Sequence, residues 1–390
     1  MKRWPTRPVG ELVLPTEQRD PRRNPTDEFC YVDIAGVDND AKAIVATKRI
    51  VGADAPSRAR KVIREGDVIV STVRPNLNAV ALVPTTFDDQ ICSTGFSVLR
   101  PSEKVVSGYL FAFVRSAAFI DYLVARTTGA NYPAVNDGEV KAVPIPVPPL
   151  TEQERIVKLL DEADDLRQLR AQADRRTAAL IPALFYEMFG DPAQNPYGWR
   201  TARLDDVANK ITDGEHQTPK RTTSGIKLLS ARNVRDGFLD FSDVDYVNED
   251  EHHRIKERCN PEQGDILLSC SGTIGRVAVV HTTERFSLVR SVALIKLKKE
   301  LLRPDFLACY LRTPHLATTM SASANASSQA NLFQNKIKAL PVFIPTMTLQ
   351  DRFVERTGEI RELGAAQATS RQRLEALFQS MLHRAFNGEF

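Results

Sequence analysis

The chain has 390 residues, 42% of them hydrophobic, and a formal net charge of +3. This is enough sequence and apolar content for two or three globular domains. No run of about 18 apolar residues occurs, so we expect no membrane-spanning helix, and the first ten residues lack the apolar stretch of a signal peptide. The five cysteines are scattered without a CxxC pair, which favours packed, reduced thiols over a disulfide framework or a zinc site. We therefore expect a cytoplasmic protein without a bound metal.

The first predicted domain, residues 1–148, mixes strands and helices. The runs "DVIVSTV" and "AVALV" are typical of strands joined through "RPNLN". The later stretch "GYLFAFVRSAAFIDYLVART" is typical of helix, and the polar loop "TGANYPAVN" follows it. This segment carries a net charge of +2. The pattern predicts an α+β domain, and the positive charge is a weak indication of a polyanionic partner.

A long helix and a linker are predicted for residues 149–194. Thr151 is a candidate N-cap with Glu154 three residues later, and an apolar stripe at three- and four-residue spacing follows. Pro182 lies inside this stripe, so we expect a kink or a separate last turn there. A helix of about forty residues is about 60 Å long, more than a small domain needs. The net charge of −3 favours protein rather than DNA contacts for this segment.

The second half of the chain repeats this order. Residues 195–346 predict a second α+β domain, of net charge +4, with strands "DILLSCS" and "RVAVV" around "GTIG"; residues 347–390 predict a second long helix. At an offset of 197 residues the two long-helix segments align without a gap over about forty residues, which indicates a duplication. We expect the helices to pack as an antiparallel, coiled-coil-like pair. The residues predicted to pack in this pair are Ile156, Leu159, Leu166, Leu180, Phe353, Ile360, Leu363 and Leu377.

Motifs of common enzymes are absent from the sequence. There is no GxxxxGK[ST] loop, no GxGxxG after a strand and no GxSxG elbow. The stretch "SGTIG" joins two predicted strands and fits a tight turn better than a phosphate-binding loop. The tetrapeptide "NPYG" lacks the second proline found in amino-methyltransferases and lies in a linker. We therefore expect a chain that is not an enzyme and has no catalytic residues.

Polar residues recur in equivalent loops of both predicted domains. Arginine pairs with guanine edges and asparagine or glutamine with adenine edges, while serine and threonine bind phosphates and base edges. For any one residue, a role in a turn or on a solvated surface is the alternative, so the prediction depends on the recurrence. The predicted DNA-binding residues are Ser71, Thr72, Arg74, Asn76, Asn78, Asn131, Tyr132, Lys220, Arg221, Arg232, Asn233, Ser269, Ser271, Thr273, Arg276, Asn325, Ser328, Gln329 and Asn331.

Three motifs, in this order and spacing, resemble the specificity subunit of type I restriction–modification enzymes: "IPVPPLTEQERIV", "MFGDPAQNPYGW" and "LFQSMLHRAFNGEF". The resemblance covers nearly the whole chain. The stretch "GDILLSCSGTIGRVAVV" is also similar to the family's recognition domains, whereas "STVRPNLN" in the first half departs from that pattern. The resemblance implies an α+β fold with two pseudo-symmetric target recognition domains, separated by two long conserved helices that pack together.

The same resemblance implies a function. Each recognition domain would read one half of a split, asymmetric site in double-stranded DNA, and the helices would fix the spacing and bind two methyltransferase (modification) subunits. Restriction subunits would complete the assembly, without a membrane. The chain itself would bind no cofactor, whereas its partners would use S-adenosylmethionine for adenine-N6 methylation, and ATP and magnesium for DNA cleavage.

Two other hypotheses remain open at this point. A protein scaffold that organises partners through its long helices, without reading DNA, would explain the acidic helix but not the repeated polar loops. A self-contained restriction enzyme would need the catalytic motifs that the sequence lacks.

Overall fold

A computed structural model describes residues 4–129, 133–324 and 331–389. The chain divides into two compact units, one of residues 1–171 with 369–390 and the other of residues 172–368. This division cuts through both long helices, so each unit contains one end of each helix. The boundaries drawn from the sequence separate the helices from the domains instead, and they stay a prediction.

Within its described residues, the first unit contains two four-stranded sheets and three short α-helices. One sheet has the order β2-β11-β8-β9 and the other the order β6-β3-β10-β7, in which β3 and β10 are parallel. Small pairs are formed by β1 with β12 and by β4 with β5. The bounds are β1 Thr6–Pro8, β2 Val13–Leu14, β3 Glu28–Val32, β4 Val37–Asp38, β5 Ala43–Ile44, β6 Lys48–Val51, β7 Ala59–Ile63, β8 Val68–Ser71, β9 Val80–Leu82, β10 Gln90–Ser93, β11 Phe96–Pro101, β12 Pro144–Pro146, α1 Ser107–Val114, α2 Ala117–Val124 and α3 Asp137–Lys141.

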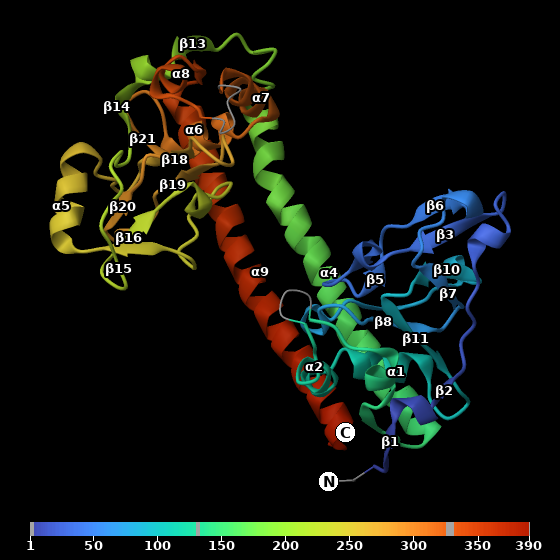
Figure 1. Cartoon of the computed structure of the whole chain (residues 1–390). Coiled ribbons are helices and arrows are strands. Elements are labelled where there is room, and N and C mark those ends of the chain that lie inside the picture. Colours follow the sequence, from blue (N-terminus) through green and yellow to red (C-terminus); the bar gives the residue numbers. More distant parts are fainter. Residues whose placement is uncertain (1–3, 130–132, 325–330, 390) are drawn as a thin grey trace. The chain divides into compact units, whose positions relative to one another are not determined.

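The strand β8 shows why this sequence makes a central strand. All four of its residues are buried. Val68 and Val70 belong to the core that contains the helices, whereas Ile69 belongs to a second core on the other face of the sheet. Because side chains alternate between the faces of a strand, a strand covered on both faces needs an unbroken apolar run. Figure 1 shows α1 against this sheet.

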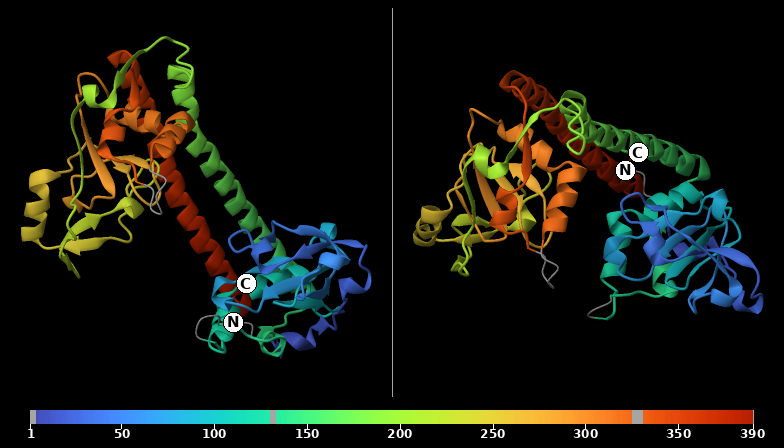
Figure 2. Two further views of the ribbon diagram at one scale, coloured as in Figure 1. Left: turned by 45° about the horizontal axis from the view of Figure 1, so that its top comes forward. Right: turned by 90° about the horizontal axis from the view of Figure 1, so that it is seen from above.

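The second unit repeats this plan. Its sheets have the orders β14-β21-β18-β19 and β15-β17-β16-β20, the second with a parallel β16–β20 pair, and β13 pairs with β22. Two further views of the ribbon are given in Figure 2. The bounds are β13 Arg200–Arg203, β14 Ala208–Asp213, β15 Arg221–Thr222, β16 Ile226–Leu229, β17 Asp245–Val247, β18 Ile266–Ser269, β19 Val277–Val279, β20 Phe286–Leu288, β21 Val292–Leu297, β22 Pro341–Ile344, α5 Glu249–Arg258, α6 Pro304–Leu311, α7 Pro314–Ser323 and α8 Gln334–Lys338.

The core of the second unit follows the same alternation. In β18, Ile266 and Leu268 belong to the core that contains the helices, and Leu267 belongs to the core on the other face. Cys270 and Cys309 lie in the first of these cores and Cys259 in the second, all as free, buried thiols. The predicted packing as buried residues is confirmed for these three, and Cys92 of the first unit is also free and buried.

Apolar helices in the first unit belong to its core. Among the described residues, no single helix is long and apolar enough to cross a membrane; α1 and α2 reach that length and composition only as a pair bent by 57°. Tyr109 and Phe113 of α1 and Phe119 of α2 are buried in the same core as Val68.

The long helices α4 (Leu150–Phe189) and α9 (Met347–Asn387) pack on each other inside the first unit. Ile156 near the start of α4 shares a core with Phe378 near the end of α9. Arg167 pairs with Glu375, with 2.6 Å between Nη2 and Oε2. The start of α4 therefore lies against the end of α9.

Inside the second unit the order is reversed. The rings of Phe185 and Phe189, near the end of α4, lie 5.9 and 5.3 Å from the ring of Phe353, near the start of α9. Both units therefore contain an antiparallel α4–α9 contact, and the predicted antiparallel pair is confirmed.

The local features predicted for α4 need correction. The helix begins at Leu150 and continues through Pro182, so Thr151 lies within the first turn instead of at the N-cap, and no last turn is split off. Proline removes one backbone hydrogen bond, but Phe185 and Phe189 beyond it are buried in the core of the second unit. This packing holds the last turns in helical form.

Half of the predicted helix-pair residues are not buried. Ile156 and Phe353 are fully buried, and Leu159 and Ile360 are partly buried. The prediction is wrong for the other four, each of which is about half exposed. The buried residues of the long helices pack against α1 in the first unit and α6 in the second as well as against each other, so the buried face is not the one predicted. These four are Leu166, Leu180, Leu363 and Leu377.

Candidate nucleic-acid interface

The end of β8 and the segment that joins it to β9 hold five predicted DNA-binding residues in different environments. Ser71 is buried, and its Oγ donates a hydrogen bond to the carbonyl of Val73 at 3.0 Å. Asn78 is also buried, and its Nδ2 donates to the carbonyl of Val114 at 2.8 Å. These two side chains shape the segment from inside.

The remaining three residues of this segment differ in exposure. Thr72 is buried and donates to the carbonyl of Gly95 at 2.9 Å. Arg74 and Asn76 are exposed. Arg74 and Asn78 have φ values of +50° and +47° and flank a short 3-10 helix, Pro75–Leu77. Both residues therefore adopt the left-handed backbone conformation, for which glycine is the usual residue.

The turn between β18 and β19 is the equivalent segment of the second unit. Ser269 is fully buried, and its Oγ donates to the carbonyl of Thr273 at 2.6 Å and accepts from the amide of Arg276 at 2.9 Å. Gly272 and Gly275 have φ values of +75° and +90°, which glycine adopts without strain. Thr273 is exposed at the tip of the turn. The stretch "SGTIG" is therefore a turn, as predicted.

In both units the structure joins this segment to the loop that follows the second short helix. In the first unit Val73 pairs with Ala134, and the amide of Val135 donates to the carbonyl of Thr72 at 2.9 Å. In the second unit the same pairing joins Ser271 to Asn331. The two kinds of polar loop predicted from the sequence are thus neighbours in each unit.

Five predicted DNA-binding residues fall outside the described parts of these loops. They are Asn131, Tyr132, Asn325, Ser328 and Gln329.

Charged contacts fix the far end of each loop. In the first unit the buried Lys61 binds Asp137, the first residue of α3, at 2.6 Å, and also the carbonyl of Phe96 at 2.7 Å. In the second unit Gln334, the first residue of α8, donates to Asp213. Each post-helix loop therefore ends on an anchored short helix.

The predicted basic cluster of the second unit is partly structural. Asn233 is buried, and its Nδ2 donates to the carbonyls of Asp240 and Asp243. Arg221 and Arg232 are exposed, but both lie near Asp245, at 3.2 and 3.4 Å. Lys220 is exposed.

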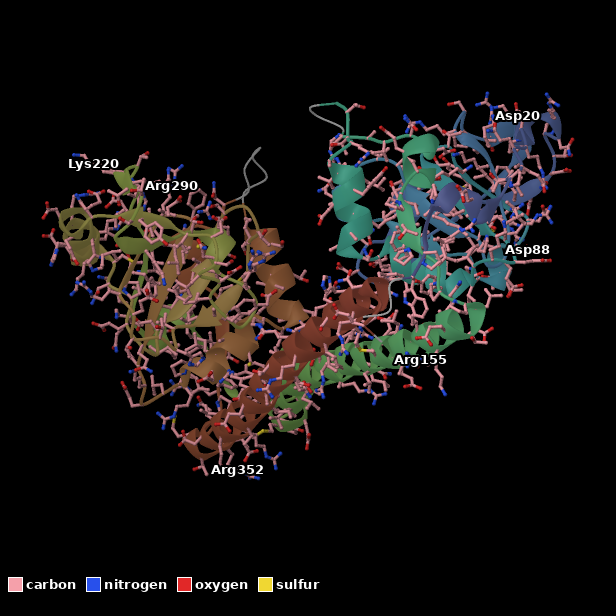
Figure 3. All side chains as sticks on the ribbon, turned by 90° about the horizontal axis from the view of Figure 1, so that it is seen from below. Asp20, Asp88, Arg155, Lys220, Arg290 and Arg352 are labelled. Carbon is pink, nitrogen blue, oxygen red and sulfur yellow. The ribbon has the colours of Figure 1, made fainter. Side chains whose placement is uncertain are left out.

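The sequence did not single out Arg290, a cation beside the polar turn and polar loop of the second unit. Arg290 is exposed in the link between β20 and β21 and lines a hollow of about 610 Å³ with Ser271 and Asn331. Its side chain forms no hydrogen bond or ion pair with any residue in the described ranges. Figure 3 shows Arg290 at the same edge of the second unit as Lys220. Only its place between two strands could have indicated it, and that signal is weak.

The exposed groups of this arrangement are better suited to DNA binding than to catalysis. Each unit presents a rigid turn beside a polar loop, and the exposed groups are Arg74 and Asn76 in the first unit and Thr273 and Arg290 in the second. Guanidinium and amide groups held on rigid turns can make the paired hydrogen bonds that distinguish bases. The buried serines and asparagines support these groups from behind.

Comparison with known proteins gives consistent matches over both halves. A family model described as the type I restriction modification DNA specificity domain matches residues 25–174 and again residues 196–357. The EcoKI specificity subunit of Escherichia coli K12 is 24% identical over 331 residues, covering 76% of this chain and 69% of that protein. The EcoBI specificity subunit of Escherichia coli is 23% identical, covering 70% and 63%.

A solved structure concerned with complex assembly and conformational transition of the type I restriction–modification system contains a similar chain. That chain is 30% identical, with a TM-score of 0.67, and the match covers 100% of this chain and 99% of the other. The scaffold hypothesis gains no support from these matches, because the family model is that of a DNA specificity domain and the relatives are specificity subunits.

Proposed function

The chain belongs to the type I restriction–modification DNA specificity family, and from this premise we propose that each unit reads one half of a split, asymmetric DNA site. The observation that carries this proposal is the repeated junction of a polar turn with a polar loop, Val73 with Ala134 and Ser271 with Asn331. Two such readers would each contact bases through a few exposed side chains, while phosphate contacts set most of the affinity.

The long helices are the proposed spacer and partner-binding elements. Leu166 and Leu169 of α4 are exposed in the first unit, and Leu180 and Leu363 are exposed in the second. Exposed leucines on helices are typical of protein interfaces when they gather in patches. We assign these surfaces to two methyltransferase subunits, and the antiparallel helices to fixing the distance between the half-sites.

The chemistry of the system belongs to the partners in this proposal. The methyltransferase subunits would use S-adenosylmethionine to methylate adenine at N6, and restriction subunits would use ATP and magnesium to cleave DNA. The chain would bind double-stranded DNA in the cytoplasm and contribute no cofactor. Because a base must leave the stack to be methylated, the partner would flip the target adenine.

Methylation mapping of the host genome tests this proposal. Deletion of the gene should abolish methylation at one split adenine motif, and restoring it should bring that motif back. Replacing residues 1–148 with the matching domain of a relative should change one half of the motif only. Survival of every methylated motif after deletion, or a change in both halves after the exchange, would refute the proposal.

A further inference from the structure

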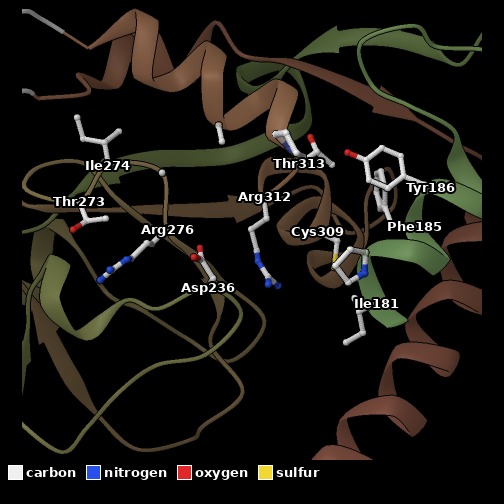
Figure 4. A pocket seen from close by; sticks show the side chains of 14 residues that line it. Ile181, Phe185, Tyr186, Asp236, Thr273, Ile274, Arg276, Cys309, Arg312 and Thr313 are labelled. Atoms are coloured by element: carbon white, nitrogen blue, oxygen red, sulfur yellow. The ribbon is translucent and has the colours of Figure 1, made fainter. Parts of the chain in front are cut away.

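A pocket in the second unit lies where α4 meets the link between α6 and α7. Its volume is about 440 Å³, and its apolar walls include Ile181 and Phe185 of α4, Ile274 of the β18–β19 turn and Ala317 of α7. Arg312, at the end of α6, lines the same pocket. Figure 4 shows Ile181, Phe185 and Ile274 around the pocket, with Arg312 reaching toward the space between Asp236 and Ile181.

Arg312 has no partner for its charge within the described parts of the chain. Its side chain forms no hydrogen bond or ion pair there, although it is only partly exposed. The nearby Arg361 is paired with Asp305 at 2.7 Å. A half-buried guanidinium without an anion is unfavourable, so an anionic group that entered this pocket would be stabilised by it.

The first unit shows how the equivalent arginine is satisfied. Arg115 ends α1 as Arg312 ends α6, one repeat of 197 residues earlier in the chain. Arg115 pairs with Asp164 at 3.3 Å, and its guanidinium lies 5.0 Å from the ring of Phe111 and 4.8 Å from that of Phe378. A carboxylate and two aromatic rings therefore surround this arginine.

The second unit has none of these three groups at the equivalent positions. At the same offset of 197 residues, Arg361 stands for Asp164, Ala308 for Phe111 and Ile181 for Phe378. Without this carboxylate and these two rings, the guanidinium of Arg312 has no ion-pair partner among the described residues, and a pocket stays open beside it. The two units are thus equivalent in backbone but not in the environment of this arginine.

We propose that the pocket receives an acidic residue and an adjacent aromatic residue from a partner protein, which together restore around Arg312 the environment that Arg115 has in the first unit. A volume of about 440 Å³ lies within the range of pockets that take drug-sized groups, about 300–1,000 Å³. The partner is the methyltransferase subunit, an assignment that rests on the proposed function. The apolar walls favour a protein over DNA, because DNA-facing surfaces are more polar and more positively charged.

Two substitutions in the full chain separately test the charge of Arg312 and the open space of the pocket. Arg312→Glu reverses the charge, and Ala317→Trp fills the pocket from an exposed position on α7. The matched control is Lys256→Glu, a charge reversal at an exposed position of α5 in the same unit. The affinity of each chain for the purified methyltransferase subunit is measured by calorimetry, its affinity for duplex DNA by fluorescence anisotropy, and its folding by thermal unfolding.

We expect Arg312→Glu and Ala317→Trp each to weaken methyltransferase binding about tenfold or more, which is the loss of a moderate interface contact, while Lys256→Glu changes it less than about twofold. If Arg312→Glu fails to fold, Ala317→Trp alone decides. Unchanged methyltransferase binding by the folded variants would overturn the proposal, as would a loss confined to DNA binding, which would assign Arg312 to phosphate. No methyltransferase binding by the unaltered chain would overturn the partner assignment of the proposed function itself.

Discussion

Gln153 and Gln350 make equivalent hydrogen bonds to the backbone in the two units. Both side chains are fully buried. Nε2 of Gln153 donates to the carbonyl oxygens of Pro148 at 2.9 Å and Lys104 at 3.3 Å, and its Oε1 accepts from the amide of Val106 at 2.9 Å. Each glutamine thus joins the first turn of a long helix to the loop before a short helix.

The partners of Gln350 are displaced by the same 197 residues. Its Nε2 donates to the carbonyls of Pro345 at 2.9 Å and Leu301 at 3.1 Å, and its Oε1 accepts from the amide of Arg303 at 2.8 Å. The duplication therefore preserves a buried polar connection and not only an apolar pattern.

Replacing Gln153 with leucine should destabilise the chain by about 1–3 kcal/mol, because a buried amide and two carbonyls lose their partners. Gln350→Leu should cost a similar amount, since its hydrogen bonds to the backbone are equivalent. Urea unfolding measures the change in the free energy of unfolding. The exposed Gln168 of α4 supplies the control, Gln168→Leu, with an expected change within about 0.5 kcal/mol; an equal loss for Gln168 would show that the buried contacts are not the cause.

The sequence predicted the fold more completely than it predicted the hydrogen bonds of these glutamines. The order of domain and long helix follows from the repeat, and the strands β8 and β18 follow from apolar runs, because burial on both faces leaves a direct mark on composition. From the sequence, Gln153 and Gln350 were recognisable only as the same residue type at equivalent positions of the repeat. Spacing does not reveal burial, so their structural role, like the exposure of Leu166 and Leu377, needed the tertiary packing.

The predicted DNA-binding residues divide in the same way. Residue type and loop position indicated that equivalent polar loops recur in both units, but not that the two loops of each unit adjoin or which side chains point outward. Ser71, Asn78, Asn233 and Ser269 are polar residues on turns whose side chains bond to the backbone inside the fold. Serine and asparagine commonly stabilise turns in this way. The same residue types therefore fit a role in a turn and a role in a DNA contact equally well.

This division predicts different effects for neighbouring substitutions in the first unit. Arg74→Ala should weaken binding of the assembled complex to its DNA site by about 1–3 kcal/mol and leave folding nearly unchanged, as expected for an exposed base contact. Asn78→Ala should instead lower the free energy of unfolding by about 1–3 kcal/mol, because the carbonyl of Val114 loses its donor. Fluorescence anisotropy and thermal unfolding separate the two effects. Loss of stability in Arg74→Ala with unchanged DNA affinity would reverse the assignment.

The exposed leucines predict a separation of folding from assembly. Leu166→Lys should change the free energy of unfolding by less than about 0.5 kcal/mol, as surface substitutions usually do, while weakening methyltransferase binding. Phe378→Ala should cost about 3–5 kcal/mol in stability, because its ring is buried in the first unit and lies beside Arg115 and Arg167. Thermal unfolding combined with size-exclusion chromatography of the mixed subunits measures both effects. A strongly destabilised Leu166→Lys would instead support packing of this leucine in the helix pair.

Lys42 gives the first unit a pH dependence whose sign can be worked out. Its Nζ donates to the carbonyl of Asn78 at 2.7 Å. Burial, with the charges of Arg115 and Arg167, lowers the pKa of Lys42 from 10.5 to about 8, although Asp40 opposes this shift. Between these two pKa values the unfolded chain binds more protons than the folded chain, so the stability contributed by this group rises with pH. Below about pH 8 both states are protonated and the full cost of burying the charge is present.

Lys42→Met removes this titration and should therefore change the shape of the stability curve. From about pH 7.5 to about pH 9.5, the free energy of unfolding of the unaltered chain should rise relative to that of Lys42→Met, because only the unaltered chain loses a buried charge over this range. Urea unfolding at several pH values gives both curves. Lys48→Met, at an exposed position of β6, is the control and should run parallel to the unaltered chain. Parallel curves for Lys42→Met as well would show that the ammonium of Lys42 is not held in a buried, charge-disfavouring environment.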